Sequence, residues 1–305
     1  MIKQIAAAAL ALGVSATGAL AEYPDRPVSI VVPFPPGDLE DVLTRMVAED
    51  FQEAYGVPTA VINVPGGGGG PFPGAVQVAN APADGSVIGS FVVAVPVVGP
   101  NLGIPELSPN PFEPLGIFLT YPFVIAASGD APYSTMQELA DYAQDNDLVL
   151  GHFGAPLVPT RVTLALADRM GFSYGSDAAF DALDCNTLAS GDADVINTTL
   201  QLILPCLDDV TILASVTGER ISILDDVPTV AEIEPSLNLS LWNGLFVHRD
   251  TPQEVRDAII AVARETMASE RAQTLAEETG ALIYWQNAEE ATAQIEADTD
   301  VINGL

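Results

Sequence analysis

The chain has 305 residues, 49% of them hydrophobic, and a formal charge of −31 at pH 7 from 41 acidic and 10 basic residues. Its only lysine is Lys3, so every later basic side chain is an arginine. This charge repels phosphate backbones and anionic lipid surfaces, and a chain without later lysines has no Schiff-base or phosphate-loop lysine. Nucleic acid and membrane surfaces are therefore disfavoured as partners, whereas either a salty medium or a cationic partner would account for the acidity.

The first 21 residues have the pattern of an export signal. Lys3 supplies a positive charge, residues 5–14 form an apolar run, and Ala19-Leu20-Ala21 has small residues at the positions that a signal peptidase reads. We therefore expect cleavage after Ala21 and a mature chain in the periplasm. No later stretch reaches about 18 consecutive apolar residues, so we expect no membrane insertion.

The length that remains after this signal predicts two domains with large cores. The chain has two cysteines, Cys185 and Cys206, and no histidine lies between or beside them. In an oxidising compartment this pattern favours a disulfide over a metal site. We expect no metal, no cofactor and a monomeric protein.

The stretch Val28 to Asp41 predicts a strand that feeds a helix through a tight turn. An apolar β-branched run stops at three prolines, Gly37 allows the backbone to turn, and an amphipathic pattern continues to about Tyr55. In an open parallel sheet, ligands bind where such a loop meets a helix N-terminus, because the first N–H groups of a helix lack internal partners. The loop from Phe34 to Asp41 is thus a candidate binding loop, and an ordinary βα turn is the alternative.

A second glycine-rich loop follows the next predicted strand, residues 59–63. Five consecutive glycines, Gly66 to Gly70, precede a helix that opens near Gly74. Their backbone N–H groups are unobstructed and are able to form an anion-binding concavity. No Lys-Ser/Thr pair follows, and Pro71 and Pro73 sit where a Rossmann helix would begin, so the loop is a poor nucleotide motif. A flexible surface linker is the alternative.

The rest of the chain continues to alternate strands and helices. Predicted strands cover residues 87–95, 115–120, 123–127, 148–150, 194–197, 211–216 and 281–285. Predicted helices cover residues 134–146, 160–170, 177–189, 251–267, a segment ending at 279, and 288–298. Tyr121-Pro122 lies between two strands and is a candidate hinge. Together the pattern predicts an α/β fold with mainly parallel sheets.

Several motifs, in this order and spacing, make the chain resemble a known family. They are YPDRPVSIVVPFPPG at residues 23–37, VINVPGGGGG at 61–70, APADG at 81–85, DVPTVAE at 226–232 and WNGLFVHRDTP at 242–252. The chain resembles the Bug-type extracytoplasmic solute-binding proteins of tripartite tricarboxylate transporters. The resemblance spans nearly the whole mature chain.

The resemblance implies a two-domain, periplasmic-binding-protein-like fold of the type II, flytrap kind. Residues 22–121 and 240–305 would form domain 1, residues 122–239 would form domain 2, and the ligand cleft would lie between them. The implied function is capture of a small carboxylate-bearing solute and its delivery to the membrane subunits of a permease. A sensor that presents its ligand to a membrane histidine kinase is the alternative, because fold and cleft would be the same.

The resemblance also implies the ligand-binding residues, by position. They are Phe34, Pro36, Gly37, Asp38 and Asp41 in the first loop, Gly66, Gly67, Gly68 and Gly69 in the second, and Ala155, Thr160, Tyr174 and Asn197 in the second domain. In this family backbone amides, hydroxyls and waters typically hold the carboxylate. Helix N-termini and glycine loops suit that task, because they attract an anion without a cationic side chain. For Thr160, helix capping is the alternative role.

Two departures from the family pattern concern the first loop. Asp38 stands where the family usually has glycine, and Glu40 stands where it has a small or hydroxyl residue. Carboxylates beside an anion site repel a carboxylate ligand unless they face solvent or hold a cation. We expect that Asp38 or Glu40 faces the cleft and shifts specificity towards a solute with an amino group, or towards an anion bridged by Ca²⁺.

Nothing in the sequence favours an enzyme. The only histidines are His152 and His248, and neither belongs to a recognisable nucleophile motif. Adjacent positions on a helix point in different directions, so Glu40 and Asp41 do not form a facing acid/base pair. His152 follows a predicted strand and is either a cleft residue or a structural one.

Overall fold

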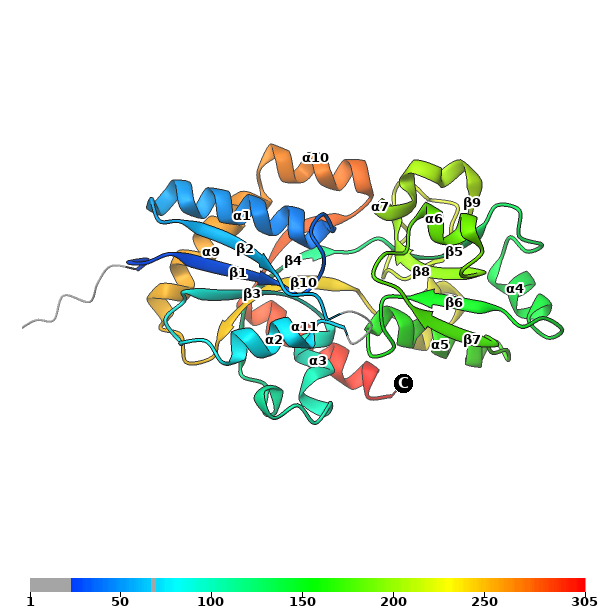
Figure 1. Cartoon of the computed structure of the whole chain (residues 1–305), viewed down its shortest axis with the longest axis horizontal. Helices are drawn as coiled ribbons and strands as arrows, with labels where there is room; N and C mark the ends of the chain where they lie inside the picture. Colours follow the sequence, from blue (N-terminus) through cyan, green and yellow to red (C-terminus); the bar gives the residue numbers. More distant parts are fainter. Residues whose placement is uncertain (1–22, 67–69, 305) are drawn as a thin grey trace, which may run out of the picture.

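The computed structural model describes residues 23–66 and 70–304 as two lobes, each built on one β-sheet (Figure 1). The first lobe holds a six-stranded sheet in the order β11-β4-β10-β3-β1-β2. The second lobe holds a five-stranded sheet in the order β7-β6-β8-β5-β9. The predicted two-domain α/β class is therefore confirmed, while the predicted boundaries at 121/122 and 239/240 stay predictions.

The strands of the first lobe come from both ends of the chain. They are β1 Val28–Val32, β2 Thr59–Asn63, β3 Val87–Val92, β4 Phe112–Thr120, β10 Trp242–His248 and β11 Leu282–Asn287. One face of the sheet is covered by α1 Leu39–Tyr55, α9 Gln253–Met267 and α10 Glu270–Thr279 (Figure 1). The other face is covered by α2 Phe72–Ala79, α3 Ala94–Val97 and α11 Ala288–Ile302. Two short 3-10 helices, Gly99–Asn101 and Pro105–Leu107, link α3 to β4.

The second lobe is formed by the middle of the chain. Its strands are β5 Phe123–Ser128, β6 Val149–His152, β7 Ser176–Ala179, β8 Val195–Thr199 and β9 Val210–Ser215. Its helices are α4 Met136–Tyr142, α5 Val158–Arg169, α6 Cys185–Ser190, α7 Leu200–Ile203 and α8 Val230–Ile233. Two short 3-10 helices cover Leu204–Asp209 and Pro235–Leu237.

Both sheets are mixed, so the prediction of mainly parallel sheets is wrong. In the first sheet β1 runs parallel to β2 and β3, but β10 runs antiparallel to β3 and β4, and β11 antiparallel to β4. In the second, β6 runs parallel to β7 and β8, whereas β5 runs antiparallel to β8 and β9. The physical reason lies in the crossings between the lobes. The chain leaves the first lobe through β4 and returns through β10, so these neighbouring strands run in opposite directions.

Three predicted elements differ from the observed ones. The helix predicted over residues 177–189 is a strand, β7, followed by the short helix α6, whose N-terminus is capped by the Asp184 carboxylate. The strand predicted to residue 95 ends at Val92, and α3 begins at Ala94. Helix α4 begins after Thr135, whose hydroxyl caps it, rather than at Ser134. Side-chain capping sets the starts of α4 and α6, because a side chain that binds a free N–H fixes where a helix starts, whereas α3 has no side-chain cap.

The predicted disulfide between Cys185 and Cys206 is present. It joins the first residue of α6 to the 3-10 helix Leu204–Asp209, with Cα atoms 5.9 Å apart. The bond thus closes the loop that carries β8 and α7. Both elements contribute residues to the site described below.

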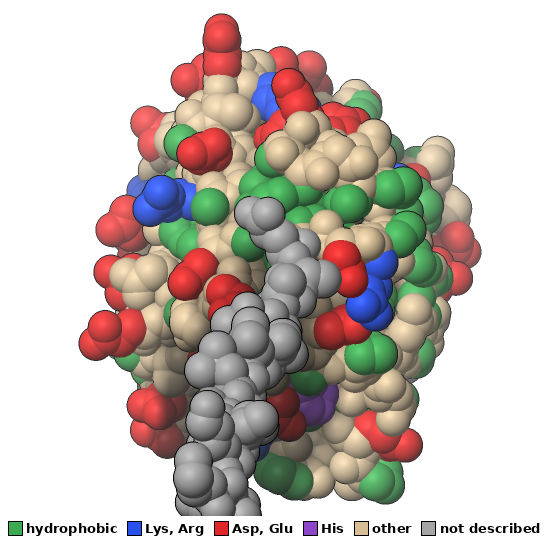
Figure 2. All heavy atoms as spheres, turned by 90° about the vertical axis from the view of Figure 1, so that its left-hand side faces the viewer, with side chains coloured by type: hydrophobic (Ala, Val, Ile, Leu, Met, Phe, Trp, Pro, Cys, Tyr) green, Lys and Arg blue, Asp and Glu red, His purple; other side chains and the backbone are tan. Residues whose placement is uncertain are grey.

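The acidic character of the chain is visible on its surface. Figure 2 looks onto the end of the first lobe, where acidic side chains are spread over the face and arginines are sparse. Arginines there pair with neighbouring acids, as Arg26 does with Asp25 and Asp84. Within residues 23–66 and 70–304, no helix combines the length and the apolar character needed to cross a bilayer.

Candidate functional site

A pocket lies between the two lobes, with about 560 Å³ of space free of atoms including its open mouth. Clefts between domains that are lined mainly by apolar side chains are common small-molecule sites. The first lobe supplies Phe34, Asp38, Leu39, Glu40, Val92, Val93, Ala94, Tyr121, Leu241 and Trp242. The second lobe supplies Phe123, Phe153, Leu157, Val158, Pro159, Thr199 and Leu202. A solute bound here would touch both lobes at once.

Two helices, one from each lobe, begin at this pocket. Leu39 and Glu40 open the 17-residue helix α1, and Val158 and Pro159 open the 12-residue helix α5. The first N–H groups of a helix carry a partial positive charge, and they have no partners within the helix. The N-terminal ends of α1 and α5 therefore both border the pocket, as the sequence predicts for the first loop.

The walls of the pocket are apolar and rich in aromatic rings. Tyr121 and Phe123 lie edge to face with ring centroids 5.8 Å apart, and Phe123 meets Phe153 in the same way at 6.2 Å. Trp242 forms the floor on the side of the first lobe and stacks on Phe246 at 6.4 Å. Among the described lining residues no side chain is basic. Rings of this kind suit an apolar ligand body or a cation.

The charged groups in the lining are both acidic. Glu40 is only 3% exposed, and its burial together with the nearby Asp38 charge raises its pKa to about 8. Burial and the charge of Asp41 raise the pKa of Asp38 to about 6. At neutral pH the Glu40 carboxyl is therefore mostly protonated in the empty pocket. Asp38 and Glu40 both line the pocket, and their effect on its specificity stays a prediction.

A chain of buried polar side chains supports Glu40 from behind. The Tyr121 hydroxyl lies beside the Glu40 carboxyl and donates its one proton to Asn243 Oδ1 at 3.3 Å. Asn243 Nδ2 in turn donates to Ser90 Oγ at 2.8 Å, and Thr44 Oγ1 donates to the same oxygen at 2.8 Å. Burial raises the pKa of Tyr121 well above its usual value, and the Glu40 charge adds to the effect. The phenol thus stays a hydrogen-bond donor beside the carboxyl group.

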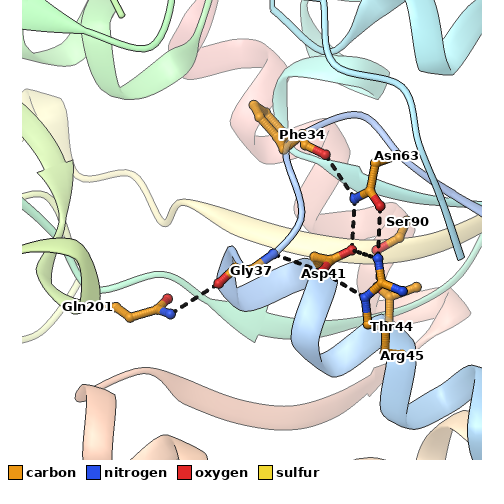
Figure 3. Close-up of polar contacts among 8 residues, drawn as sticks. All are labelled: Phe34, Gly37, Asp41, Thr44, Arg45, Asn63, Ser90 and Gln201. Carbon is orange, nitrogen blue, oxygen red and sulfur yellow. Dashed lines mark hydrogen bonds and ion pairs between the residues drawn. The ribbon is translucent and has the colours of Figure 1, made fainter. Parts of the chain in front are cut away.

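The Asp41 carboxylate, in the first turn of α1, holds the first loop (Figure 3). It accepts hydrogen bonds from the Gly37 N–H at 2.9 Å, from Arg45 Nε and Nη2 at 2.9 Å each, and from Asn63 Nδ2 at 2.8 Å. Asn63 Nδ2 also donates to the Phe34 carbonyl at 3.0 Å. Burial raises the pKa of Asp41, but the bonds from Arg45 and Asn63 outweigh it, and the pKa lies below its usual value. Glu40 and Asp41 thus serve different partners, as their adjacent positions predict.

Trp242 is held in the pocket floor by the C-terminal helix. Its Nε1–H donates to the buried Asp298 carboxylate at 2.7 Å, and Gln294 Nε2 donates to the other carboxylate oxygen at 3.0 Å. Both partners lie on α11. The last helix therefore fixes the orientation of one pocket wall.

His152 orders the loop that leads into α5. Its ring is 2% exposed, with Nε2 2.8 Å from Asp177 Oδ1, and its Nδ1 accepts the Gly154 N–H at 3.0 Å. Thr160 Oγ1 donates to the Gly154 carbonyl at 2.9 Å. The loop carries Phe153 and Leu157 into the pocket, whereas His152 itself is outside the lining. Of the two readings of His152, the structure supports the structural one.

We expect His152→Ala to destabilise the protein by roughly 2 kcal/mol, because it leaves a small void and an unpaired Gly154 N–H. Chemical denaturation monitored by circular dichroism measures the loss. His248→Ala is the matched control, because the His248 ring also accepts a backbone N–H, at 3.3 Å, but is more exposed, so we expect a loss below about 1 kcal/mol. Equal losses in the two variants would contradict the ordering role of His152.

The predicted ligand residues separate into three groups in the structure. Phe34 and Asp38 line the main pocket, and Gly66 lines a smaller neighbouring cavity together with Gly70 and Phe153. Gly67, Gly68 and Gly69 lie outside the described residues. The remaining residues are outside the lining of both cavities; they are Pro36, Gly37, Asp41, Ala155, Thr160, Tyr174 and Asn197.

Two of these outlying residues hold buried polar atoms. Asn197 is fully buried on β8, where its Nδ2 donates to Thr163 Oγ1 at 3.0 Å. Among the described residues, no partner contacts Asn197 Oδ1 or the Tyr174 hydroxyl. Asn197 lies behind α5, because Thr163 donates in turn to the carbonyl of the lining residue Pro159. Its link to the pocket is therefore indirect.

Four of the lining residues that the sequence analysis missed lie at the crossings between the lobes. Tyr121, Phe123, Leu241 and Trp242 flank the two crossing segments, where the Tyr121 N–H donates to the Leu241 carbonyl at 2.7 Å. The predicted hinge at Tyr121-Pro122 was the available signal. A hinge in a two-lobed protein also borders the cleft, so its neighbours are natural wall residues.

Two lobes on mixed sheets, joined by adjacent crossings and enclosing a pocket lined from both sides, define a two-domain solute-binding protein. Residues 43–302 match the sequence profile described as "Tripartite tricarboxylate transporter family receptor". The chain belongs to this family. Its class is therefore that of a solute-binding receptor, not of an enzyme.

The relatives agree with this assignment. A "UPF0065 protein in tcbD-tcbE intergenic region" of Pseudomonas sp. strain P51 is 28% identical over 284 residues, covering 87% of this chain and 81% of the relative. The periplasmic binding protein BugD has a solved structure that superimposes with a TM-score of 0.79 at 25% identity, over 91% of this chain and 95% of BugD.

Two solved structures with ligands share the fold. MatC of Rhodopseudomonas palustris with bound malate has a TM-score of 0.77 at 23% identity, over 92% of this chain and all of MatC. An R. palustris protein described with adipate has a TM-score of 0.81 at 21% identity, over 92% of this chain and 96% of its own. At this identity the likeness concerns the fold.

Proposed function

We propose that this chain is a periplasmic receptor that captures a small carboxylate-bearing solute between its two lobes and delivers it to the membrane permease of a tripartite transport system. The pocket between the lobes carries this proposal. A ligand there is enclosed by residues of both lobes, so binding and closure favour each other. The closed, loaded form is then the form that the permease recognises.

Backbone donors support the carboxylate part of the proposal. The N-termini of α1 and α5 both open at the pocket, and such ends bind carboxylates without a basic side chain. Relatives of the same fold are described with malate and adipate, which are both dicarboxylates. A carboxylate held by main-chain N–H groups also fits a lining that has no arginine among its described residues.

Contacts between the lobes support the closure step. Gln201 Nε2, on α7 of the second lobe, donates to the Gly37 carbonyl of the first loop at 3.3 Å (Figure 3). Arg161 Nη2, on α5, donates to the Ile302 carbonyl of α11 at 2.9 Å. Each bond joins one lobe to the other, and each would break when the lobes separate.

We expect Gln201→Ala to weaken solute binding by roughly two- to fivefold, because the variant loses a bond that only the closed form makes. Isothermal titration calorimetry measures the affinity. Gln137→Ala is the matched control, because Gln137 is exposed on α4 and bonds only within its own helix, to Asp141. An unchanged affinity in Gln201→Ala would show that this bond does not contribute to closure.

A thermal-shift screen of residues 22–305 tests solute capture. The panel contains malate, adipate, citrate, aromatic acids and amino acids. A solute that binds only the folded state stabilises it by RT ln(1 + [L]/Kd), so the melting temperature rises with affinity and concentration. The proposal requires at least one small carboxylate to produce a saturable rise, and a panel without any rise would contradict it.

The gene neighbourhood tests the delivery step. Genes for a large and a small membrane permease subunit beside this one would support transport. A gene for a membrane histidine kinase in their place would overturn it and favour a sensor. The same protein would bind its solute in both cases, so the two tests are independent.

A further inference from the structure

We propose that the pocket between the lobes selects a solute with a cationic amino group on an apolar body, and that the carboxyl groups of Asp38 and Glu40 supply its counter-charge. This inference rests on the proposed function and deepens it by naming the class of solute. The ligand would still present a carboxylate to the helix N-termini, so it would be an amino acid or a close analogue. A plain dicarboxylate would be a poor ligand.

The first step of the argument is the sign of the charges in the pocket. Asp38 and Glu40 both line it, and no described lining residue is basic. A second carboxylate on the solute would be repelled by the Asp38 carboxylate in a medium of low dielectric, and it would keep Glu40 from ionising. An ammonium group at the same place would instead form charge-assisted hydrogen bonds. The lining therefore discriminates between the two by charge.

The second step is the character of the walls. Phe34, Phe123, Phe153 and Trp242 line the same pocket as the two acids, and Tyr121 lies beside Glu40. Aromatic faces attract a cation as well as an apolar body, and the attraction grows when water is excluded. A buried carboxyl group within an aromatic enclosure is thus a complementary site for an ammonium group. The aliphatic side chains of Val92, Leu157 and Leu202 also line the pocket and would contact an apolar part of the solute.

The third step concerns the proton on Glu40. In the empty pocket burial and Asp38 keep this carboxyl largely protonated at neutral pH. A bound ammonium group favours the carboxylate, so Glu40 releases its proton to solvent and the ammonium group donates to the resulting anion. The groups that face Glu40 are Asp38, Asp41 and Tyr121. Binding of an amine is therefore coupled to release of a proton and becomes tighter as the pH rises from about 6 to 8.

A metal-bridged anion is the competing explanation for the two acids. Ca²⁺ takes six to eight oxygen ligands, as a rule. Within residues 23–66 and 70–304, no cluster of three or more acidic, histidine or cysteine side chains is arranged to hold a metal ion. Two carboxyl groups in an aromatic enclosure match one ammonium group better than a calcium ion.

Matched compounds test the inference with residues 22–305. One set is adipate, 6-aminohexanoate and 1,6-diaminohexane; the other is 3-phenylpropanoate, phenylalanine and 2-phenylethylamine. Calorimetry at pH 7.5, with EDTA and separately with Ca²⁺, gives each affinity, and titration in two buffers of different ionisation enthalpy counts released protons. We expect an amino-bearing member of at least one set to bind about tenfold or more tighter than its carboxylate-only counterpart, and to release a proton.

Substitutions assign the effect to the two acids. Asp38→Asn and Glu40→Gln should each lower the affinity for the amino-bearing compound by about tenfold, and so reduce the ratio of its affinity to that of the carboxylate-only counterpart. Glu40→Gln should also abolish the release of a proton on binding. Asp25→Asn, which removes an exposed acid far from the pocket, is the control. Melting curves verify that every variant folds.

The outcomes separate this inference from the proposed function. If a carboxylate-only compound binds as tightly as its amino counterpart, or if tight binding requires Ca²⁺, the inference fails while the proposed function stands. The inference is also overturned if Asp38→Asn and Glu40→Gln both keep the wild-type preference for the amino-bearing compound. If no compound of either set binds, the amino-bearing class is wrong, and the carboxylate screen above decides the proposed function separately.

Discussion

Glu40→Gln is expected to stabilise the empty protein at alkaline pH by roughly 4 kcal/mol, and to leave its stability nearly unchanged at pH 4. Glutamine has the shape of the protonated acid and fills the same space. It keeps a hydrogen-bonding partner for Tyr121 without the cost of a buried charge. A stabilising substitution inside a binding pocket is typical of proteins whose function requires an unfavourable buried group.

Glu40→Gln is stabilising rather than destabilising because the pKa of Glu40 is raised in the folded protein. Burial and the Asp38 charge raise it from 4.5 to about 8 in the folded protein. Below pH 4.5 the group is protonated in both states and has no effect. Between pH 4.5 and 8 the unfolded chain ionises while the folded protein does not, so folding becomes less favourable. Asp38, whose burial raises its pKa to about 6, acts in the same direction.

Urea denaturation of wild type and Glu40→Gln from pH 4 to 9 measures the difference. The free energy of unfolding of Glu40→Gln minus that of wild type should increase steadily up to about pH 8 and then level off. Glu49→Gln, a change on the exposed side of α1, should show no such rise. A flat difference across this range would mean that Glu40 does not carry the pKa that its surroundings impose.

Asp41→Ala is expected to cost roughly 3 kcal/mol of folding free energy and to weaken solute binding by at least about tenfold. The Asp41 carboxylate accepts four hydrogen bonds from Gly37, Arg45 and Asn63 (Figure 3). Without it the Gly37 N–H loses its acceptor, and the Asn63 amide keeps only the Phe34 carbonyl. The loop that carries Phe34 and Asp38 then loses its attachment to α1.

Denaturation curves give the stability of this variant, and calorimetry with the best solute gives its affinity. Asp41→Asn keeps one acceptor oxygen and should lose about half as much. Asp25→Ala removes an exposed acid from a surface ion pair and should change stability by less than about 0.5 kcal/mol. If Asp41→Ala binds its solute normally, the network has no part in shaping the pocket.

The first binding loop could be predicted because its signals are local. An apolar run, a proline and glycine cluster and an amphipathic helix lie within residues 28–55, and β1 and α1 were found with their bounds nearly correct. The prediction that an acid faces the cleft was also local, because α1 begins at Leu39 and its first turn meets the pocket. Capping and periodicity act over a few residues and leave a clear pattern in the sequence.

The direction of the strands could not be predicted, because it depends on distant parts of the chain. The pattern of strands and helices is the same whether β10 enters the first sheet parallel or antiparallel to its neighbours. Its direction is set by the return of the chain from the second lobe. The mixed sheets are a consequence of topology, and periodicity carries no information about topology.

The pocket walls were missed for a related reason. Trp242 and Leu241 are far from Phe34 in sequence, and Phe153, Leu157 and Leu202 lie in the other lobe. A buried aromatic residue has the same sequence signature in a core and in a pocket wall. The family resemblance predicts that Tyr174 and Asn197 lie near the cleft, whereas neither residue lines the pocket between the lobes. Only the packing of two lobes distinguishes these cases.

The fluorescence of Trp242 tests the central claim, capture of a solute between the lobes, most directly. The chain has two tryptophans, so Trp285→Phe leaves Trp242, in the pocket floor, as the only one. Titration with the compound that gives the largest thermal shift should change its emission with the same affinity as calorimetry. Leu202→Trp, with its new ring in the pocket, should abolish both the thermal shift and the heat of binding. A tight solute that leaves Trp242 emission unchanged and still binds Leu202→Trp would contradict the account.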